Sequence, residues 1–131
     1  MGRKMRPLLF ALLAALAGCG ILEPEPELEI SGVVRASTGE PVAGARVEAF
    51  FQSPWNGGVL LQESTTSTPD GTFDVRIGTP PGYAAPNCEL LRIQALATGF
   101  WPSEPMGVGS GTCVFIEGVE IVLEPKEAQG P

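Results

Sequence analysis

The 131-residue sequence contains no histidine and is poor in basic side chains. Eight Lys and Arg residues stand against 15 Asp and Glu residues, so the formal net charge is −7 at pH 7. An acidic surface repels phosphate groups, so we expect no nucleic-acid partner. Without histidine, a serine or cysteine nucleophile lacks its usual base, and a zinc site lacks a common ligand. We therefore expect no metal, no cofactor and no enzymatic activity; paired carboxylates among Glu63, Asp70 and Asp74 are the alternative that stays open.

Helical periodicity is also missing beyond the N-terminal segment. The apolar fraction of 44% argues against a disordered chain, and 17 glycines and 13 prolines supply many turns. Between these turns, apolar and polar residues alternate with a period of two. Strands are expected at 28–34, 45–51, 59–66, 73–77, 91–97, 113–116 and 119–123. The fold class that follows is all-β, a single antiparallel β-sandwich of about six or seven strands.

Three glycine-containing stretches predict how these strands connect and pack. Residues 41–44 should turn the chain so that the second strand pairs beside the first, with Gly44 in an unusual backbone conformation. The turn Pro69-Asp70-Gly71 predicts a hairpin between 59–66 and 73–77. Gly32, inside the first strand, marks a place where a neighbouring backbone can come close.

The N-terminal 18 residues have the composition of an export signal. Three basic residues lie between positions 3 and 6, ahead of an uncharged apolar run that is too short to span a membrane. The run ends in Leu16-Ala17-Gly18-Cys19, which resembles the lipobox of bacterial lipoproteins. The resemblance implies cleavage before Cys19 and a lipid on that cysteine. An ordinary secretory signal that contains a cysteine is the alternative.

The lipobox divides the chain and predicts its location. Residues 1–18 would be the signal peptide, 19–27 an acidic and proline-rich tether, 28–125 the sandwich and 126–131 a polar tail. The expected protein is exported and anchored to the cell envelope, with the membrane as a partner through the lipid on Cys19. Gly20, rather than aspartate, follows the cysteine, which favours the outer membrane if the cell is Gram-negative.

Cys88 and Cys113 remain as an even pair once Cys19 carries lipid. In an exported protein, a disulfide between them is the default expectation. Two free buried thiols, or a metal site, are the alternatives.

Four aromatic residues do not fit the pattern of the core. Phe50 falls on the polar face of its strand, and Trp55, Tyr83 and Trp101 fall in loops. Such rings can stack on a sugar or anchor a protein, so an envelope protein or a glycan is the expected partner. The alternative is that Trp55 and Trp101 cap the ends of the sandwich and that a loop covers Phe50.

An ordered series of short segments resembles the carboxypeptidase regulatory-like domains. These segments are Ser31-Gly32-Val33-Val34, residues 39–47 (GEPVAGARV), 67–73 (STPDGTF), 97–100 (ATGF) and 119–125 (VEIVLEP). The resemblance implies a prealbumin-like sandwich that acts as an accessory module, with no shared catalytic residues. The hydroxyisourate hydrolases of this fold depend on histidines, which this chain lacks.

These observations predict a non-catalytic lipoprotein that serves as a binding or structural module at the bacterial envelope. The first alternative is an accessory subunit or chaperone-like partner of a larger envelope complex, docked through an exposed strand edge. The second is a carbohydrate- or peptide-binding protein that uses the exposed aromatics.

Overall fold

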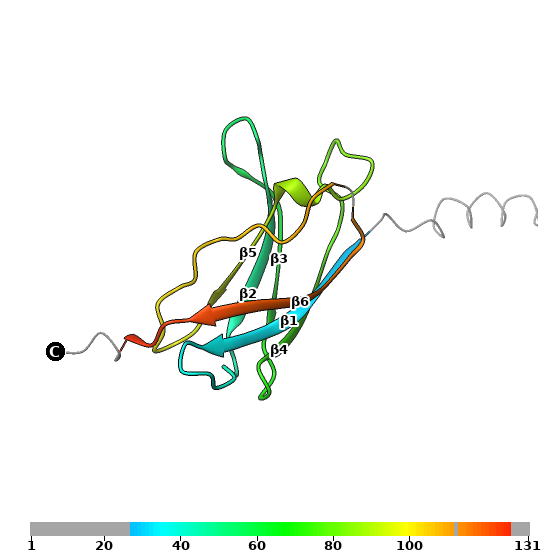
Figure 1. Cartoon of the computed structure of the whole chain (residues 1–131). Helices are drawn as coiled ribbons and strands as arrows, with labels where there is room; N and C mark the ends of the chain where they lie inside the picture. The colour runs from blue at the N-terminus through cyan, green and yellow to red at the C-terminus, as the bar shows by residue number, and fades with distance from the viewer. Residues whose placement is uncertain (1–26, 112, 127–131) are drawn as a thin grey trace, which may run out of the picture.

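Six strands form from the alternating segments in the part of the chain that the computed structural model describes, residues 27–111 and 113–126. They are β1 (Leu28–Ala36), β2 (Arg46–Gln52), β3 (Val59–Thr66), β4 (Thr72–Ile77), β5 (Leu91–Leu96) and β6 (Phe115–Leu123), with one 3-10 turn, η1 (Cys88–Leu90), before β5 (Figure 1). None of the described residues forms a helix long and apolar enough to cross a membrane. The expected all-β fold is confirmed.

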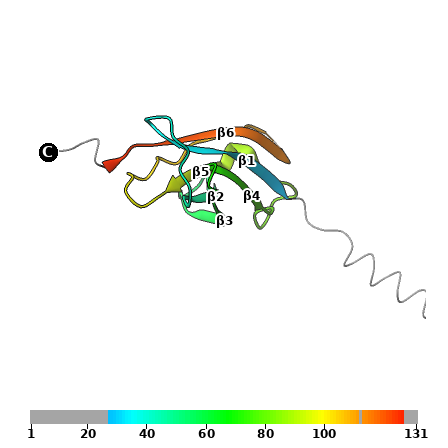
Figure 2. The same ribbon diagram turned by 90° about the horizontal axis from the view of Figure 1, so that it is seen from below.

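The strands form two three-stranded sheets, in the orders β4-β1-β6 and β3-β2-β5. Figure 2 shows the two sheets as stacked layers. Because side chains alternate along a strand, each sheet turns one apolar row toward the other. The largest fully buried side chains of this core are Phe51, Leu28, Ile30, Ile77, Leu91, Ile93, Ile121 and Leu123. The sandwich expected from the sequence is therefore present.

The pairing of β1 with β6 is parallel, whereas the other three pairs are antiparallel. The prediction that all neighbouring strands are antiparallel is wrong for β1 and β6. A long connection, of which residues 97–111 and 113–114 are described, carries the chain back along the sandwich before β6 begins, so β6 runs in the same direction as β1. The two expected strands 113–116 and 119–123 are one strand with a register shift opposite Ile30 and Gly32. Alternation encodes the faces of a strand but not its direction.

Two expected strand pairings are wrong. β1 and β2 lie in different sheets, and so do β3 and β4, although each pair is consecutive in the chain. The turn at Gly71 pairs with β1 instead: the Val34 amide donates to the Gly71 carbonyl at 2.8 Å. Ser67 joins the connection between β1 and β2 to the connection between β3 and β4. Its buried hydroxyl donates to the Val42 carbonyl (2.7 Å) and accepts from the Ala45 amide (2.9 Å). Turn residues predict a reversal of the chain, but packing selects the sheet that the next strand joins.

Gly32 lies where three strands meet closely. A Cβ atom built on it would overlap the Val119 carbonyl of β6 and lie 2.9 Å from Cζ of Phe73 in β4. Phe73 is also the register partner of Gly32. The close approach expected at this glycine is confirmed. Gly44, two residues before β2, has φ of 72°, which confirms its expected conformation.

Candidate functional site

The two ends of the sandwich carry different features. β1 begins at one end, where β4 finishes and where the β2–β3 loop and the connection after β4 also lie (Figure 1). The opposite end holds the connection after β1, the connection after β5 and the end of β6 (Figure 1). We call these the β1-start end and the β6-end.

The expected disulfide between Cys88 and Cys113 is confirmed at the β1-start end, with a sequence separation of 25 and a Cα–Cα distance of 6.1 Å. Cys88 is fully buried in η1. Its amide donates to the Gly111 carbonyl at 2.8 Å, beside the bond itself. The disulfide therefore ties the start of β5 to the segment that leads into β6.

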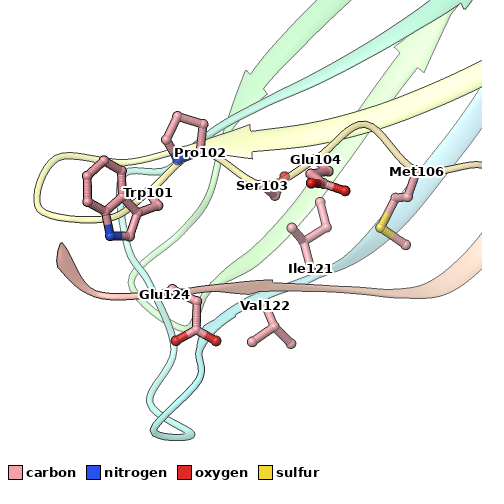
Figure 3. Close-up of a pocket in the computed structure, with 8 residues that line it drawn as sticks. All are labelled: Trp101, Pro102, Ser103, Glu104, Met106, Ile121, Val122 and Glu124. Carbon is pink, nitrogen blue, oxygen red and sulfur yellow. The ribbon is translucent and has the colours of Figure 1, made fainter. Parts of the chain in front are cut away.

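A hollow of about 310 Å³ lies between the segment after β5 and the last part of β6 (Figure 3). Its floor contains the buried Ile121 and the half-buried Met106. The exposed side chains of Trp101, Glu104 and Glu124 stand around it. Pro102, Ser103 and Val122 complete the lining.

Backbone hydrogen bonds fix both walls of this hollow. Met106 and Ile93 exchange two bonds of 2.9 Å, and the Ser103 amide donates to the Ala95 carbonyl at 3.0 Å. The Ser103 hydroxyl also accepts from the Ala95 amide at 2.8 Å. The amide of Trp101 donates to the Glu124 carbonyl at 2.9 Å, which closes the hollow against β6. The site is therefore formed before any ligand arrives.

The ring of Trp101 already attracts a positive charge. Nζ of Lys126 lies 5.1 Å from the ring centroid, within the range of a cation–π interaction. The indole is 45% exposed, so part of its surface stays open to a ligand. An open aromatic face beside the carboxylates of Glu104 and Glu124 suits the apolar face and hydroxyl donors of a sugar, or a Lys or Arg side chain.

A second, more open hollow of about 440 Å³ adjoins the first at the β6-end. The two hollows share Pro102 as a lining residue. The second contains the basic side chains of Arg46 and Lys126, whereas the first contains two carboxylates. An extended ligand across Pro102 would therefore meet opposite charges on its two sides.

The structure separates the other candidate aromatics from Trp101. Trp55 is 89% exposed in the β2–β3 loop, so the alternative in which it caps the sandwich is wrong. Tyr83 is 36% exposed in the connection between β4 and η1. Both loops lie at the β1-start end (Figure 1). Of the four candidates, Trp101 lines the hollow between the segment after β5 and β6.

The prediction that the Phe50 ring is exposed on the polar face of β2 is wrong. It is only 8% exposed, although it lies outside the main core cluster. Its register partners are Gln62 of β3 and Arg92 of β5. Long side chains on both sides of a ring can cover it with their methylene groups, so the outer face of a sheet is not necessarily wet.

The sequence analysis missed Glu104, Met106 and Glu124 as site residues. They come from two segments that meet only when residues 101–106 lie along β5. In the sequence, the one signal for this region was Trp101, an aromatic residue that did not fit the pattern of the core. Glu63, Asp70 and Asp74 line neither hollow. Within residues 27–111 and 113–126, no three His, Cys, Asp or Glu side chains group so as to hold a metal ion.

No protein-family model and no curated protein matches the sequence. Solved structures share the fold: chlorocatechol 1,2-dioxygenase from Pseudomonas putida is 17% identical with a TM-score of 0.51, covering 75% of this chain and 60% of that one. Catechol 1,2-dioxygenase from Acinetobacter radioresistens is 12% identical with a TM-score of 0.53, covering 83% and 55%. A 9R-lipoxygenase from Cyanothece PCC8801 is 13% identical with a TM-score of 0.53, covering 74% and 16%. This chain therefore spans less than two thirds of each of these proteins, and the likeness is one of fold.

The comparison corrects the expectation that this chain is not an enzyme. These three solved structures are two dioxygenases and a lipoxygenase, so the sandwich occurs within catalytic chains. The earlier inference rested on missing histidine, which excludes particular nucleophile and zinc chemistries but does not exclude catalysis by other groups. Activity depends on site residues placed on a scaffold, and the scaffold by itself excludes none.

Proposed function

We propose that the protein is an exported lipoprotein of the bacterial cell envelope, anchored by a lipid on Cys19, and that its sandwich binds a partner through the hollow at Trp101. The anchor rests on the sequence Leu16-Ala17-Gly18-Cys19, which lies outside the described residues. The order of segments that resembles carboxypeptidase regulatory-like domains supports an accessory module of this kind. The partner would be an envelope glycan or an envelope protein.

The position of the hollow is the observation that carries this proposal. β1 begins next to the tether and spans nine residues before it ends beside Leu123. At a rise of about 3.3 Å per residue, this strand separates the two ends of the sandwich by roughly 30 Å. The hollow follows directly at Glu124. An anchored domain could therefore present it away from the membrane.

The chemistry of the hollow favours a ligand with an apolar face and hydrogen-bond donors. Its volume of about 310 Å³ lies at the lower end of the range for small-molecule sites. A sugar ring stacked on Trp101, or one basic side chain of a protein, would fill it. The walls are fixed by hydrogen bonds, so binding would order little additional chain.

A second candidate function is docking as a subunit of a larger envelope complex. β6 is an outer strand of its sheet, and Phe115 and Val122 on it are 54% and 46% exposed. An extended segment of a partner could pair with this edge and place one side chain in the hollow.

Crosslinking in native membranes, followed by mass spectrometry, tests the binding site. Trp101→Ala should lose the captured partner, because the aromatic wall is removed while both backbone walls remain. Trp55→Ala is the matched control, since it removes an exposed indole at the other end and should capture the same partner. Equal capture by both variants would show that the hollow is not the site.

Metabolic labelling with a fatty-acid analogue tests the anchor separately. Wild-type protein should carry the label, and Cys19→Ser should not, because the acceptor sulfur is gone. An unlabelled wild-type protein, or a labelled Cys19→Ser variant, would contradict the lipidation.

A further inference from the structure

Exposed apolar side chains gather at the β1-start end. Seven large hydrophobic residues are exposed in the described part of the chain, and five of them belong to this end: Trp55, Val59, Tyr83, Val114 and Phe115. The other two, Trp101 and Val122, lie at the β6-end. The β1-start end therefore exposes more large apolar side chains than the β6-end.

Strand pairing places two of the five beside the start of β1. The Glu29 amide donates to the Val114 carbonyl at 3.1 Å, and Phe115 is the register partner of Glu29. Both residues therefore lie next to the point where the tether would enter the domain. Phe115 is 54% exposed and Val114 is 60% exposed.

The other three lie in or beside loops at the same end. Val59 pairs with Gln52, at the foot of the loop that carries Trp55. Tyr83 follows β4, whose last residue, Ile77, pairs with Leu28 at the start of β1. A Cβ built on Gly78 would lie 3.9 Å from Cδ2 of Leu61, so the connection after β4 runs close to β3. In Figure 1, the β2–β3 loop projects at the top of the domain, and the connection after β4 lies at the upper right, above the start of β1.

The chain outside the described residues indicates what this end faces. Eight residues, 20–27, stand between Cys19 and Leu28. Because a residue spans at most about 3.6 Å, the start of β1 can lie no farther than roughly 30 Å from an acylated Cys19. The β1-start end is thus the part of the domain whose distance from the bilayer the tether limits. This step rests on the lipidation proposed above.

The chemistry of this end matches a zwitterionic lipid headgroup layer. Trp and Tyr favour the membrane–water interface, and Trp55, at 89% exposure, is the most exposed large apolar side chain described. The carboxylates of Glu27, Glu29 and Glu89 lie at the same end, where Arg76 approaches Glu29 at 3.8 Å. Carboxylates are repelled by anionic lipids, so a zwitterionic surface fits better.

We propose that the β1-start end rests on the headgroup layer of the membrane that holds the anchor, with Trp55 inserted in the interface. The contact is a second membrane signal beside the lipid, and it orients the domain so that the hollow at Trp101 points away from the bilayer.

The two tryptophans of the chain provide the test, because one lies at each end. Trp101→Phe leaves Trp55 as the only indole, and Trp55→Phe leaves Trp101. Each full-length lipidated variant is placed in phosphatidylcholine vesicles with bromine near the top of the acyl chains, and its fluorescence is compared with that in unbrominated vesicles. The fluorescence of Trp55 should be quenched, because its indole would lie in the interface close to the bromine atoms. Trp101 should be unchanged.

Flotation of the same samples separates the two proposals. Protein that floats with the vesicles while Trp55 is no more quenched than Trp101 would overturn the membrane contact and leave the anchor standing. Protein that does not float, and carries no acyl mass, would overturn the anchor and the contact together. Adding phosphatidylglycerol should reduce the quenching of Trp55, and an increase would contradict the charge argument.

Discussion

Opening the Cys88–Cys113 bond should cost the domain about 3.5 kcal/mol of unfolding free energy, from the chain-entropy value for a loop closed across 25 residues. The cleanest perturbation is Cys113→Ala. Cys88 is fully buried and would stay as a small apolar side chain, whereas Cys113 is only half-buried, so the substitution removes the crosslink with little loss of packing. For a domain of this size, that free energy corresponds to roughly 15–25 °C in Tm.

Urea unfolding followed by tryptophan fluorescence measures the effect, on protein comprising residues 20–131, in which Cys88 and Cys113 are the only cysteines. Wild-type protein in reductant should match the Cys113→Ala variant, and reductant should leave the variant unchanged. A loss below about 1 kcal/mol in both would refute the reasoning that the bond stabilises the fold by restricting the unfolded chain.

Two further substitutions test how the sheets are held together. Gly32→Ala should destabilise by about 3 kcal/mol, because its Cβ would overlap the Val119 carbonyl; Gly107→Ala, which meets only ordinary contacts, should stay within about 0.5 kcal/mol. Equal midpoints in urea for the two variants would contradict the close packing of β1 on β6. Ser67→Ala should cost about 2 kcal/mol, since two buried backbone groups lose the hydroxyl that joins them, whereas the exposed Ser64→Ala should be neutral in the same assay.

The sequence predicted most elements of the sandwich but not their partners. A period of two located the strands, because side chains on opposite faces of a strand meet core and solvent alternately. The turn at 69–71 was located as well, but it carries the chain from one sheet to the other rather than closing a hairpin. A turn motif restricts a few dihedral angles, and the strand that follows pairs wherever its apolar row is best buried.

The candidate site was accessible to sequence analysis only through one of its residues. Trp101 stood out as an aromatic residue in a loop, but nothing local linked it to Glu124, 23 positions later in the chain. The hollow exists because 101–106 lies along β5 while β6 returns beside it. The same limit applies to Phe50, which is 8% exposed and whose register partners lie on two other strands.

The sequence by itself determined the strand-forming segments, the place for a glycine at position 32, the cysteine pair and the expectation of an anchored, exported chain. These follow from local chemistry. Apolar and polar residues alternate along the strands, glycine alone fits a close approach of two backbones, and the cysteines can be counted. Near the N-terminus, basic, apolar and small residues follow one another in the order of an export signal. The tertiary structure alone decided the parallel β1–β6 pair, the separation of Trp55 from Trp101, and the hollow that Trp101 borders. Each of these depends on contacts between distant segments, and such contacts are set by the packing of the two sheets as a whole.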